Sequence, residues 1–419
     1  MMCYEIEGGR RLCGQVRVSG SKNAALPILC AALLNDGETV LHHCPAISDV
    51  AQACRILKSL GCRVKRQQDT IWIDAKDAFE APLWEEMTGG MRASVLFLGP
   101  LLGRFRKAAL GKPGGCAIGK RPIDYHVTVA QALGAVCREE NGCFLFDGSN
   151  MQAGKVVLPF PSVGATENAM CLAACLPGKT VICGAAREPE IYDLQQFLKA
   201  MGVRIQGAGT DSIWVEGKEI STSVSYRVMP DRIEAGTLLA AAAVTGGKIF
   251  LSDSDWLTMT GILPFFACCG CQISVKGAEV GLKAPKRLKA CPCLLTKTYP
   301  GFPTDMQPLA AALLTTAKGT SMIMEQIFEN RFHHCTELNK MGGRIGCSGP
   351  VAVIEGVRHL KGTTVCASDL RAGAALMVAG LGAEGKTVVT NGQYICRGYA
   401  GLEKKLAALG GRVRLMESR

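Results

Sequence analysis

The stretch Ala200-Met-Gly-Val-Arg-Ile205 recurs with changes at five other places in this chain of 419 residues. The first glycine of each copy falls at position 61, 134, 202, 270, 342 or 410, which gives steps of 73, 68, 68, 72 and 68 residues. A period of this kind is the signature of a repeated structural unit. The sequence therefore predicts six copies of one subdomain of about 70 residues.

Each repeat has the same expected order of elements. The glycine ends a helix at its C′ position, where a left-handed backbone is needed. Alternating stretches such as Thr70–Asp74, Cys143–Asp147 and Ser212–Glu216 predict strands. A second helix of small apolar residues starts near 22, 91, 162, 230, 303 or 368, and its lack of a polar face predicts burial.

Six such units divide naturally into two domains of three. The strand-like stretch Gln15–Val18 precedes the first small-residue helix, whereas no such helix follows the last unit. We therefore expect the N-terminal strand to complete the C-terminal domain. The predicted domains are residues 22–229 and residues 1–21 plus 230–419, in an α/β (α+β) fold with the active site in the cleft between them.

The amino-acid composition of the chain indicates which class of binding partner to expect. The chain carries 47 Lys and Arg against 36 Asp and Glu, a net charge of +11, but aromatic residues are only 6% and the cations are scattered. This pattern disfavours nucleic acid and favours a phosphorylated small substrate. No apolar run approaches the ~20 residues of a membrane span, so we expect no membrane insertion.

The 21 cysteines predict a reducing compartment rather than a disulfide scaffold. The chain opens without a basic segment followed by an apolar core, which favours the cytoplasm. The clusters at 268–271 and 291–293 lack the spaced pairs of a zinc site, so no metal is expected.

Polar residues gather where the six buried helices are expected to start. These residues are Lys22, Asn23, Arg92, Ser162, Asp231, Arg232, Asp305, Asp369 and Arg371. Helix N-termini attract anions, and two triplets of them would form an electropositive cage. Ser162 and Asp231 also fit simple N-capping. Lysine and arginine oppose the helix dipole there, which favours a functional role for them.

The loop Gly111–His126 has four glycines, two prolines and one thiol, Cys116. The nearby cations Lys112, Lys120 and Arg121 would lower the pKa of that thiol. We interpret the loop as a reactive lid. Two further cations, Arg331 and Arg397, stand in stretches that break the repeat, and Ala186–Glu190 is either a solvated turn or functional.

Six motifs together resemble the UDP-N-acetylglucosamine 1-carboxyvinyltransferases, which belong with EPSP synthase, over essentially the whole chain. They are Ser21–Pro27, Gly114–Gly119 with Arg121 and Pro122, Phe160–Asn168, Phe302–Gln307, Phe328–Phe332 and Asp369–Arg371. The shikimate-pathway relative shares the six-fold repeat but lacks the cysteine lid, so Cys116 favours the first group.

The resemblance implies a two-domain inside-out α/β barrel of six βαβαββ-type repeats. It also implies transfer of enolpyruvate from phosphoenolpyruvate to the 3′-hydroxyl of UDP-N-acetylglucosamine, in the first committed step of peptidoglycan synthesis. Phosphate leaves by addition and elimination through a tetrahedral intermediate. We expect no cofactor, a cytoplasmic monomer or weak homo-oligomer, and alkylation of Cys116 by fosfomycin.

The same resemblance assigns roles to residues. Cys116 is the general acid, and Asp305 sits where the hydroxyl loses its proton. Lys22, Arg121 and Arg397 hold phosphoenolpyruvate with help from Arg331 and Arg371, while Asn23 meets the tetrahedral centre. The nucleotide-sugar pocket is lined by Arg92, Ser162, Val163, Asp305 and Ile327, closed by Arg121, Pro122, Ile123, Asp124 and Tyr125, and bordered by Asp369.

The chain departs from the family pattern before Arg397, where Tyr394 and Cys396 replace a histidine and an aspartate. Two alternatives to this function stay open, and the difference before Arg397 motivates the first of them. One is a catalytically weak paralogue that binds the nucleotide sugar and regulates the pathway. The other is a related enolpyruvyl transferase with another acceptor.

Overall fold

The computed structural model describes residues 2–114, 118–119 and 122–417, which form two compact units. The N-terminal unit holds residues 20–114 and 122–229, and the C-terminal unit holds residues 2–19, 118–119 and 230–417. The chain passes between the units at 19–20 and 229–230, where the sequence predicted 21–22 and 229–230. Residues 118–119, which lie in the sequence between two stretches of the N-terminal unit, also belong to the C-terminal unit. Gly20 and Ser21 lie in the N-terminal unit because Ser21 N–H donates to Met229 O at 2.8 Å.

The N-terminal unit is built from eleven described strands and seven α-helices. The strands are β3 (Glu38–His42), β4 (Arg63–Gln67), β5 (Thr70–Asp74), β6 (Lys107–Gly111), β7 (Val136–Glu140), β8 (Cys143–Asp147), β9 (Lys155–Val157), β10 (Gly178–Cys183), β11 (Arg204–Gln206), β12 (Ser212–Gly217) and β13 (Val224–Arg227). The helices are α1 (Lys22–Ala31), α2 (Ser48–Ser59), α3 (Glu85–Thr88), α4 (Leu98–Phe105), α5 (Asp124–Ala132), α6 (Val163–Ala174) and α7 (Pro189–Ala200), with 3-10 helices η1 (Ala32–Leu34) and η2 (Arg92–Phe97).

The C-terminal unit is built from twelve described strands and six α-helices. The strands are β1 (Met2–Glu7), β2 (Cys13–Arg17), β14 (Lys248–Ser252), β15 (Gln272–Lys276), β16 (Glu279–Lys283), β17 (Leu294–Leu295), β18 (Thr320–Met324), β19 (Arg344–Ser348), β20 (Val351–Glu355), β21 (Thr364–Cys366), β22 (Lys386–Thr390) and β23 (Arg412–Glu417). The helices are α8 (Arg232–Val244), α9 (Leu263–Cys268), α10 (Gln307–Leu314), α11 (His333–Lys340), α12 (Leu370–Gly382) and α13 (Leu402–Ala408), with 3-10 helices η3 (Trp256–Met259), η4 (Thr304–Met306) and η5 (Gly392–Arg397).

The third repeat shows the common plan, β9–α6–β10–α7–β11–β12. Its sheet has the order β11-β12-β10-β9, in which β9 runs parallel to β10 and the other pairs are antiparallel. In the register of this sheet, Ile182 lies opposite Val156 on one side and Ile213 on the other. A small-residue helix therefore connects the parallel strands, and an outer helix connects β10 to the antiparallel pair.

Strands are exchanged where the chain passes between the units. Strand β2 precedes α1 in the sequence but pairs in parallel with β14 in the C-terminal unit. Strand β13 precedes α8 but pairs in parallel with β3 in the N-terminal unit. Strand β1, which was not expected, pairs with both β22 and β23 and supplies the last strand of the sixth repeat. The second repeat has only the described sheet β6-β8-β7, and a single bridge from Leu83 to Leu110 takes the place of its parallel strand.

The six repeat glycines all have the predicted left-handed backbone. Their φ angles are +89° at Gly61, +96° at Gly134, +84° at Gly202, +87° at Gly270, +92° at Gly342 and +95° at Gly410. A side chain is strained in this region of φ, which explains why glycine recurs at this point of every repeat. The prediction of a helix C-terminus at each glycine is confirmed.

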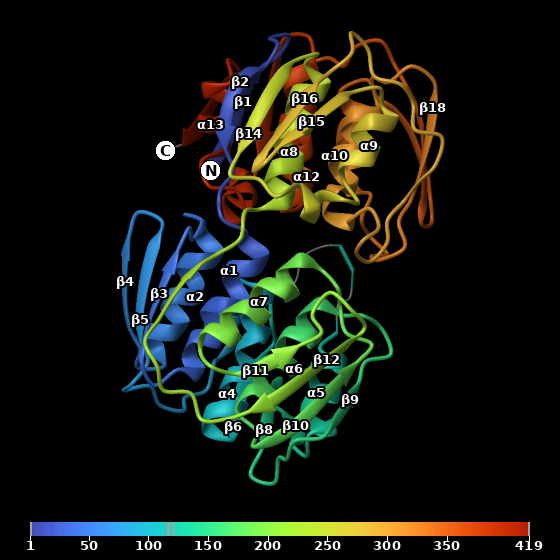
Figure 1. The fold of residues 1–419 in the computed structure, drawn as a ribbon. Helices are drawn as coiled ribbons and strands as arrows, with labels where there is room; N and C mark the ends of the chain where they lie inside the picture. Colours follow the sequence, from blue (N-terminus) through green and yellow to red (C-terminus); the bar gives the residue numbers. More distant parts are fainter. Residues whose placement is uncertain (1, 115–117, 120–121, 418–419) are drawn as a thin grey trace. The chain divides into compact units, whose positions relative to one another are not determined.

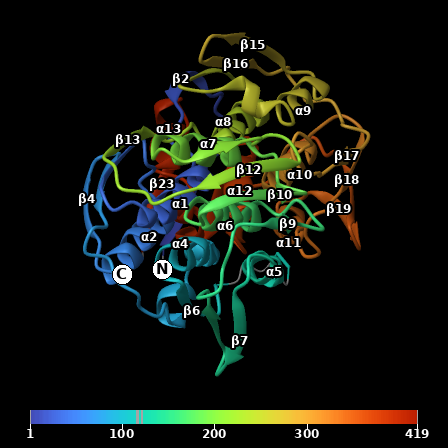
Figure 2. The ribbon, with the colours of Figure 1, turned by 60° about the horizontal axis from the view of Figure 1, so that its bottom comes forward.

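The small-residue helices are buried, as their composition predicted. Every residue of α10 is buried, and α8, α10 and α12 contact one another, as Figure 1 shows. In the N-terminal unit α4 contacts α6, and η2, which leads into α4, contacts α1 and α6. Figure 2 shows α1, α4 and α6 close together. Alanine and glycine permit this close approach, and the sheets supply the outer layer. None of the described helices is long and apolar enough to cross a membrane.

A largely buried ion pair between Lys405 and Glu234 anchors Ser19 in the C-terminal unit. Ser19 is the last residue of this unit before the chain passes to the N-terminal unit. Lys405 Nζ donates to both carboxylate oxygens of Glu234 at 2.8 Å and to Ser19 Oγ at 2.7 Å. Ser19 N–H also donates to Glu234 at 2.6 Å. Burial raises the pKa of Glu234, and the charge of Lys405 opposes that rise.

Replacing Lys405 by methionine removes the cation that offsets this burial. We expect Lys405→Met to lower the free energy of unfolding by about 3 to 5 kcal/mol, the usual cost of breaking a buried pair from one side. The exposed neighbour Lys404 is the control, and Lys404→Met should change stability by less than about 0.5 kcal/mol. Urea unfolding measures both, and equal stabilities for the two variants would contradict this role.

Asp193 makes the stability of the N-terminal unit depend on pH. Its carboxylate accepts hydrogen bonds from Tyr226 OH at 2.6 Å and Met229 N–H at 3.2 Å, and burial raises its pKa to about 6. The folded state therefore binds this proton more tightly than the unfolded chain. The stabilisation is fully present below the ordinary pKa of 3.8 and is lost as pH rises through about 6.

We expect the stability advantage of the wild type over Asp193→Asn to fall by about 3 kcal/mol between pH 3.5 and pH 7, because each pKa unit corresponds to about 1.4 kcal/mol. Urea unfolding across this range measures the difference. Asp211→Asn, at an exposed position, should show no such trend. The same trend in both variants would show that Asp193 is not its source.

Candidate active site

The predicted site residues of the N-terminal unit lie at helix starts, as expected. Lys22 and Asn23 are the first two residues of α1, which Ser21 caps through its hydroxyl on Ala24 N–H at 3.3 Å. The Lys22 ammonium lies 2.6 Å from Asp49 Oδ2, and both side chains are largely buried. The ion pair offsets the unfavourable position of a cation at a helix N-terminus. It also fixes the direction in which the ammonium points.

Ser162 and Val163 begin α6. Ser162 is the N-cap, and its hydroxyl accepts a hydrogen bond from Ala165 N–H at 3.4 Å. The capping interpretation that the sequence left open for Ser162 is therefore realised in the structure. The cap occupies one acceptor position of the hydroxyl, which can still donate a hydrogen bond to a ligand.

Arg92 is brought together with the segment that was expected to close over the nucleotide sugar. It is the first residue of η2, and its Nη2 donates to Pro122 O at 3.0 Å. Ile123 is buried, and Asp124 and Tyr125 begin α5. Cys116 and Arg121, which carry the lid prediction, lie outside the described residues, as does Lys120.

Sequence reasoning quoted Asn168 only as part of a motif and missed its structural role. Its Oδ1 accepts from Gly99 N–H at 2.8 Å, and its Nδ2 donates to Val95 O at 3.0 Å and lies 2.7 Å from His126 Nδ1. One buried amide thus joins α6 to α4 and α5. The available signal was the polar run Thr166–Asn168 within a helix of small apolar residues.

The C-terminal unit brings four predicted residues into one ionic cluster, formed by Asp305, Arg331, Asp369 and Arg371. Asp305 Oδ2 accepts from Arg371 Nη2 at 2.8 Å and from Nε at 3.1 Å, and its Oδ1 lies 3.3 Å from Arg331 Nη2. Arg331 Nη1 lies 3.6 Å from Asp369 Oδ1. We call this group the Asp305 cluster.

Exposure differs sharply within the Asp305 cluster. The side chains of Arg331 and Arg371 are only 2% and 4% exposed, whereas that of Asp305 is 28% exposed. The side chain of Asp305 is thus partly exposed, whereas the two guanidinium groups that contact its carboxylate are buried. Three of these residues lie where a helix begins. Asp305 is in η4, Asp369 is the N-cap of α12, and Arg371 is in the first turn of α12.

Neighbouring aromatic and neutral groups support the cluster. The Arg371 guanidinium lies over the Tyr399 ring at 5.4 Å from its centroid, and Tyr399 OH lies 2.9 Å from Thr237 Oγ1. Burial on its own lowers the pKa of Arg371, but Asp305 and Tyr399 outweigh it and hold the pKa above its ordinary value. Burial also lowers the pKa of His334 to about 3, so this imidazole stays neutral beside Arg331.

The residues that depart from the family pattern contact the interior of their own unit. Arg397 ends η5, and Cys396 Sγ lies 3.3 Å from Tyr4 OH and 3.5 Å from Met2 Sδ, both on β1. Tyr394 packs against the hydrophobic core. Cys396 therefore serves the packing of η5 on β1.

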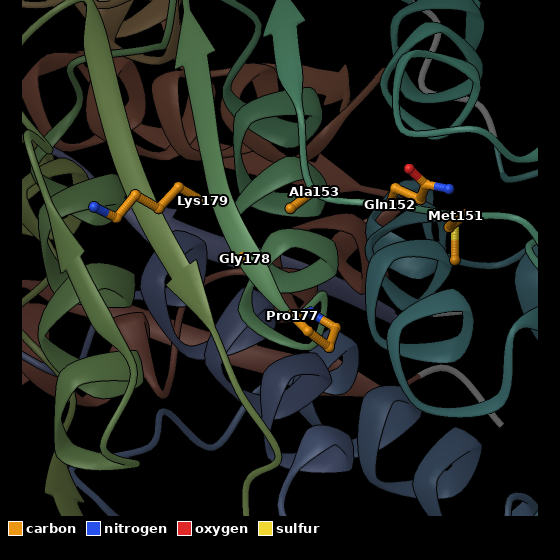
Figure 3. Close-up of a pocket in the computed structure, with 6 residues that line it drawn as sticks. All are labelled: Met151, Gln152, Ala153, Pro177, Gly178 and Lys179. Atoms are coloured by element: carbon orange, nitrogen blue, oxygen red, sulfur yellow. The ribbon is translucent and has the colours of Figure 1, made fainter.

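A separate hollow of about 500 Å³ lies in the N-terminal unit, lined by Met151, Gln152, Ala153, Pro177, Gly178 and Lys179. None of these was predicted as a site residue, and Figure 3 shows the Gln152 amide and the Lys179 ammonium pointing in different directions. The described residues hold no group of three or more His, Cys, Asp or Glu side chains suited to a metal ion. The Asp305 cluster remains the stronger candidate.

Comparisons with known proteins agree with this geometry. The profile of the family EPSP synthase (3-phosphoshikimate 1-carboxyvinyltransferase) matches residues 6–406. The chain belongs to this family. It is 47% identical to the UDP-N-acetylglucosamine 1-carboxyvinyltransferase 1 of Symbiobacterium thermophilum, across 98% of this chain and 94% of that one. It is 43% identical to the UDP-N-acetylglucosamine 1-carboxyvinyltransferase 2 of Caldanaerobacter subterraneus, across 99% of both.

Solved structures show the fold of this family. The enolpyruvyl transferase NikO of Streptomyces tendae matches with a TM-score of 0.90 at 24% identity, covering 100% of this chain and 99% of that one. EPSP synthase of Acinetobacter baumannii matches with a TM-score of 0.77 at 16% identity, covering 100% of both chains. The predicted fold class and the resemblance to the family are confirmed.

Proposed function

We propose that this protein transfers the enolpyruvyl group of phosphoenolpyruvate to the 3′-hydroxyl of UDP-N-acetylglucosamine and releases phosphate, at the first committed step of peptidoglycan synthesis. The observation that carries the proposal is the partly exposed Asp305 side chain, whose carboxylate is held by two buried guanidinium groups. The relatives at 43% to 47% identity are named for transfer to UDP-N-acetylglucosamine, which supports the choice of acceptor.

In the addition step the proton of the 3′-hydroxyl goes to Asp305 and the oxygen attacks C2 of phosphoenolpyruvate. Cys116 gives a proton to C3, which becomes a methyl group in the tetrahedral intermediate. In the elimination step the Cys116 thiolate takes a proton from the C3 methyl group and the C2–O bond to phosphate breaks. The proton held by Asp305 leaves with the phosphate, and an enol ether remains. Proton transfers by positioned groups of this kind accelerate reactions by about 10²- to 10⁴-fold each.

The cations have two tasks in this scheme. Lys22, Arg121 and Arg397 bind the phosphate and carboxylate of phosphoenolpyruvate, and Arg331 and Arg371 assist them. Because Arg331 and Arg371 also hold Asp305, an arriving anion competes for their charge. The carboxylate then becomes a better proton acceptor when the substrate is bound.

Asn23 meets the tetrahedral centre. The nucleotide sugar contacts Arg92, Ser162, Val163 and Ile327 as well as Asp305 and Asp369, and the segment Arg121–Tyr125 closes over it. Arg92 already holds Pro122 of that segment. Substrate binding that moves the segment would therefore be transmitted to Arg92.

The competing acceptor is shikimate 3-phosphate, since the family profile carries the name of that reaction. The experiment measures phosphate release from phosphoenolpyruvate with each acceptor. The proposal expects release only with UDP-N-acetylglucosamine. Release with shikimate 3-phosphate alone would overturn it, and calorimetric binding of the nucleotide sugar without turnover at any pH would favour the regulatory paralogue.

The proposed setting is the cytoplasm, without cofactor or metal and with the protein as a monomer or weak homo-oligomer. The described cysteines are free thiols, which suits a reducing compartment. Sedimentation across a range of protein concentrations tests the oligomeric state, and a stable higher oligomer at low concentration would contradict it.

A further inference from the structure

Glu325 is a buried carboxylate directly after β18. Its position in the sequence did not suggest a role. The residue is 3% exposed. Its Oε1 accepts from Thr296 Oγ1 at 2.8 Å, Ile327 N–H at 2.8 Å and Phe328 N–H at 3.3 Å. Its Oε2 accepts from Thr304 Oγ1 at 2.9 Å. Four neutral donors thus converge on one carboxylate.

The donors come from three separate segments. Thr296 follows β17, Thr304 begins η4, and Ile327 and Phe328 lie in the connection from β18 to α11. Burying a carboxylate is costly unless hydrogen bonds compensate, and bonds to a charged acceptor are about twice as strong as neutral ones. An arrangement of this kind holds the three segments at fixed spacing.

Two of these segments lead into the Asp305 cluster. Thr304 immediately precedes Asp305, and Thr304 O accepts from Arg331 Nε and Nη2 at 3.4 Å. Ile327 and Phe328 are followed within a few residues by Arg331, which lies 3.3 Å from Asp305. The contacts therefore close a ring from Glu325 through Thr304, Asp305 and Arg331 back to Glu325.

We propose that Glu325 is a positioning residue that sets the spacing between Asp305 and Ile327. This inference rests on the proposed function, in which Asp305 takes the proton of the sugar hydroxyl and Ile327 contacts the same nucleotide sugar. The carboxylate touches neither substrate. It acts through Thr304 on one side and through the backbone amides of Ile327 and Phe328 on the other.

The test separates positioning from plain stability. Thr304→Val removes the hydroxyl donor, Thr304→Ser keeps it, and Glu325→Ala removes the acceptor. A displacement of about 1 Å can cost about 10²-fold in rate, so we expect kcat to fall about 10- to 100-fold in Thr304→Val and Glu325→Ala. Thr304→Ser should stay within about threefold of the wild type. The matched control is Thr316→Val, which removes a threonine hydroxyl that donates to Leu313 O after the end of α10.

A merely structural role would lower the melting temperature and leave the kcat of the folded protein unchanged. Positioning predicts that kcat falls at a temperature where every variant is folded. It also predicts that the double variant Glu325→Ala/Thr304→Val loses no more activity than the worse of the two single variants. An active wild type with unchanged kcat in Thr304→Val and Glu325→Ala overturns the positioning role alone. A wild type that releases no phosphate with UDP-N-acetylglucosamine overturns the proposed function.

Discussion

Asp305→Asn is expected to lower kcat about 10³-fold while leaving the affinity for UDP-N-acetylglucosamine within a fewfold of the wild type. The amide keeps the shape of the side chain but cannot take the hydroxyl proton, and loss of a general base typically costs about 10²- to 10⁴-fold. Steady-state phosphate release gives kcat, and calorimetry gives the affinity.

The effect should be specific to this carboxylate. Asp255→Asn, at an exposed position in the same unit, is the control and should behave as the wild type. A variant Asp305→Asn that kept more than about a tenth of the wild-type kcat would remove Asp305 from the role of base, since general-base contributions are rarely that small.

Cys116→Ala should lower kcat by about 10²-fold or more, because an alanine side chain cannot give a proton to C3. The same substitution should abolish the mass increase that fosfomycin produces. Cys366→Ser, which removes an exposed thiol of the C-terminal unit, should keep both turnover and labelling.

Both readouts are needed for Cys116. Its surroundings lie outside the described residues, so the prediction rests on the sequence of the loop, where Lys112, Lys120 and Arg121 flank the thiol. A Cys116→Ala protein that lost the label but kept full turnover would show that the thiol is reactive and is not the general acid.

The local sequence pattern was sufficient to predict most helices and strands of each repeat. The six glycines determined where helices end, and the strands expected at Thr70–Asp74 and Cys143–Asp147 are observed with the same bounds. Alternation and helix-ending residues are properties of neighbouring positions, which explains this agreement. The buried helices followed from composition for the same reason.

Pairings between distant parts of the chain were harder to predict. Strand β1 pairs with β22 and β23, nearly 400 residues away, and its alternating Tyr4 and Ile6 are buried. The signal was the last repeat, which has one strand after its outer helix where the others have two. Nothing local shows that the second repeat replaces its parallel strand by a single bridge at Leu83.

The candidate site shows the same contrast between local features, which the sequence predicted, and long-range contacts, which it did not. Sequence position located Lys22, Ser162, Asp305 and Arg371 at helix starts, but it did not show that Arg371 holds Asp305, 66 residues away. Glu325 and Asn168 were missed because their roles depend on which backbone groups surround them. A buried polar residue must find partners, yet the sequence does not name them.

The central claim is enolpyruvyl transfer to UDP-N-acetylglucosamine by addition and elimination. Mass spectrometry of the nucleotide product after reaction in D₂O tests it most directly, because solvent hydrogen enters C3 during addition. We expect UDP-N-acetylglucosamine bearing one enolpyruvyl group with deuterium in its vinyl position, formed in equal amount with phosphate. An unmodified nucleotide sugar, or an enolpyruvyl product without deuterium, would contradict the account.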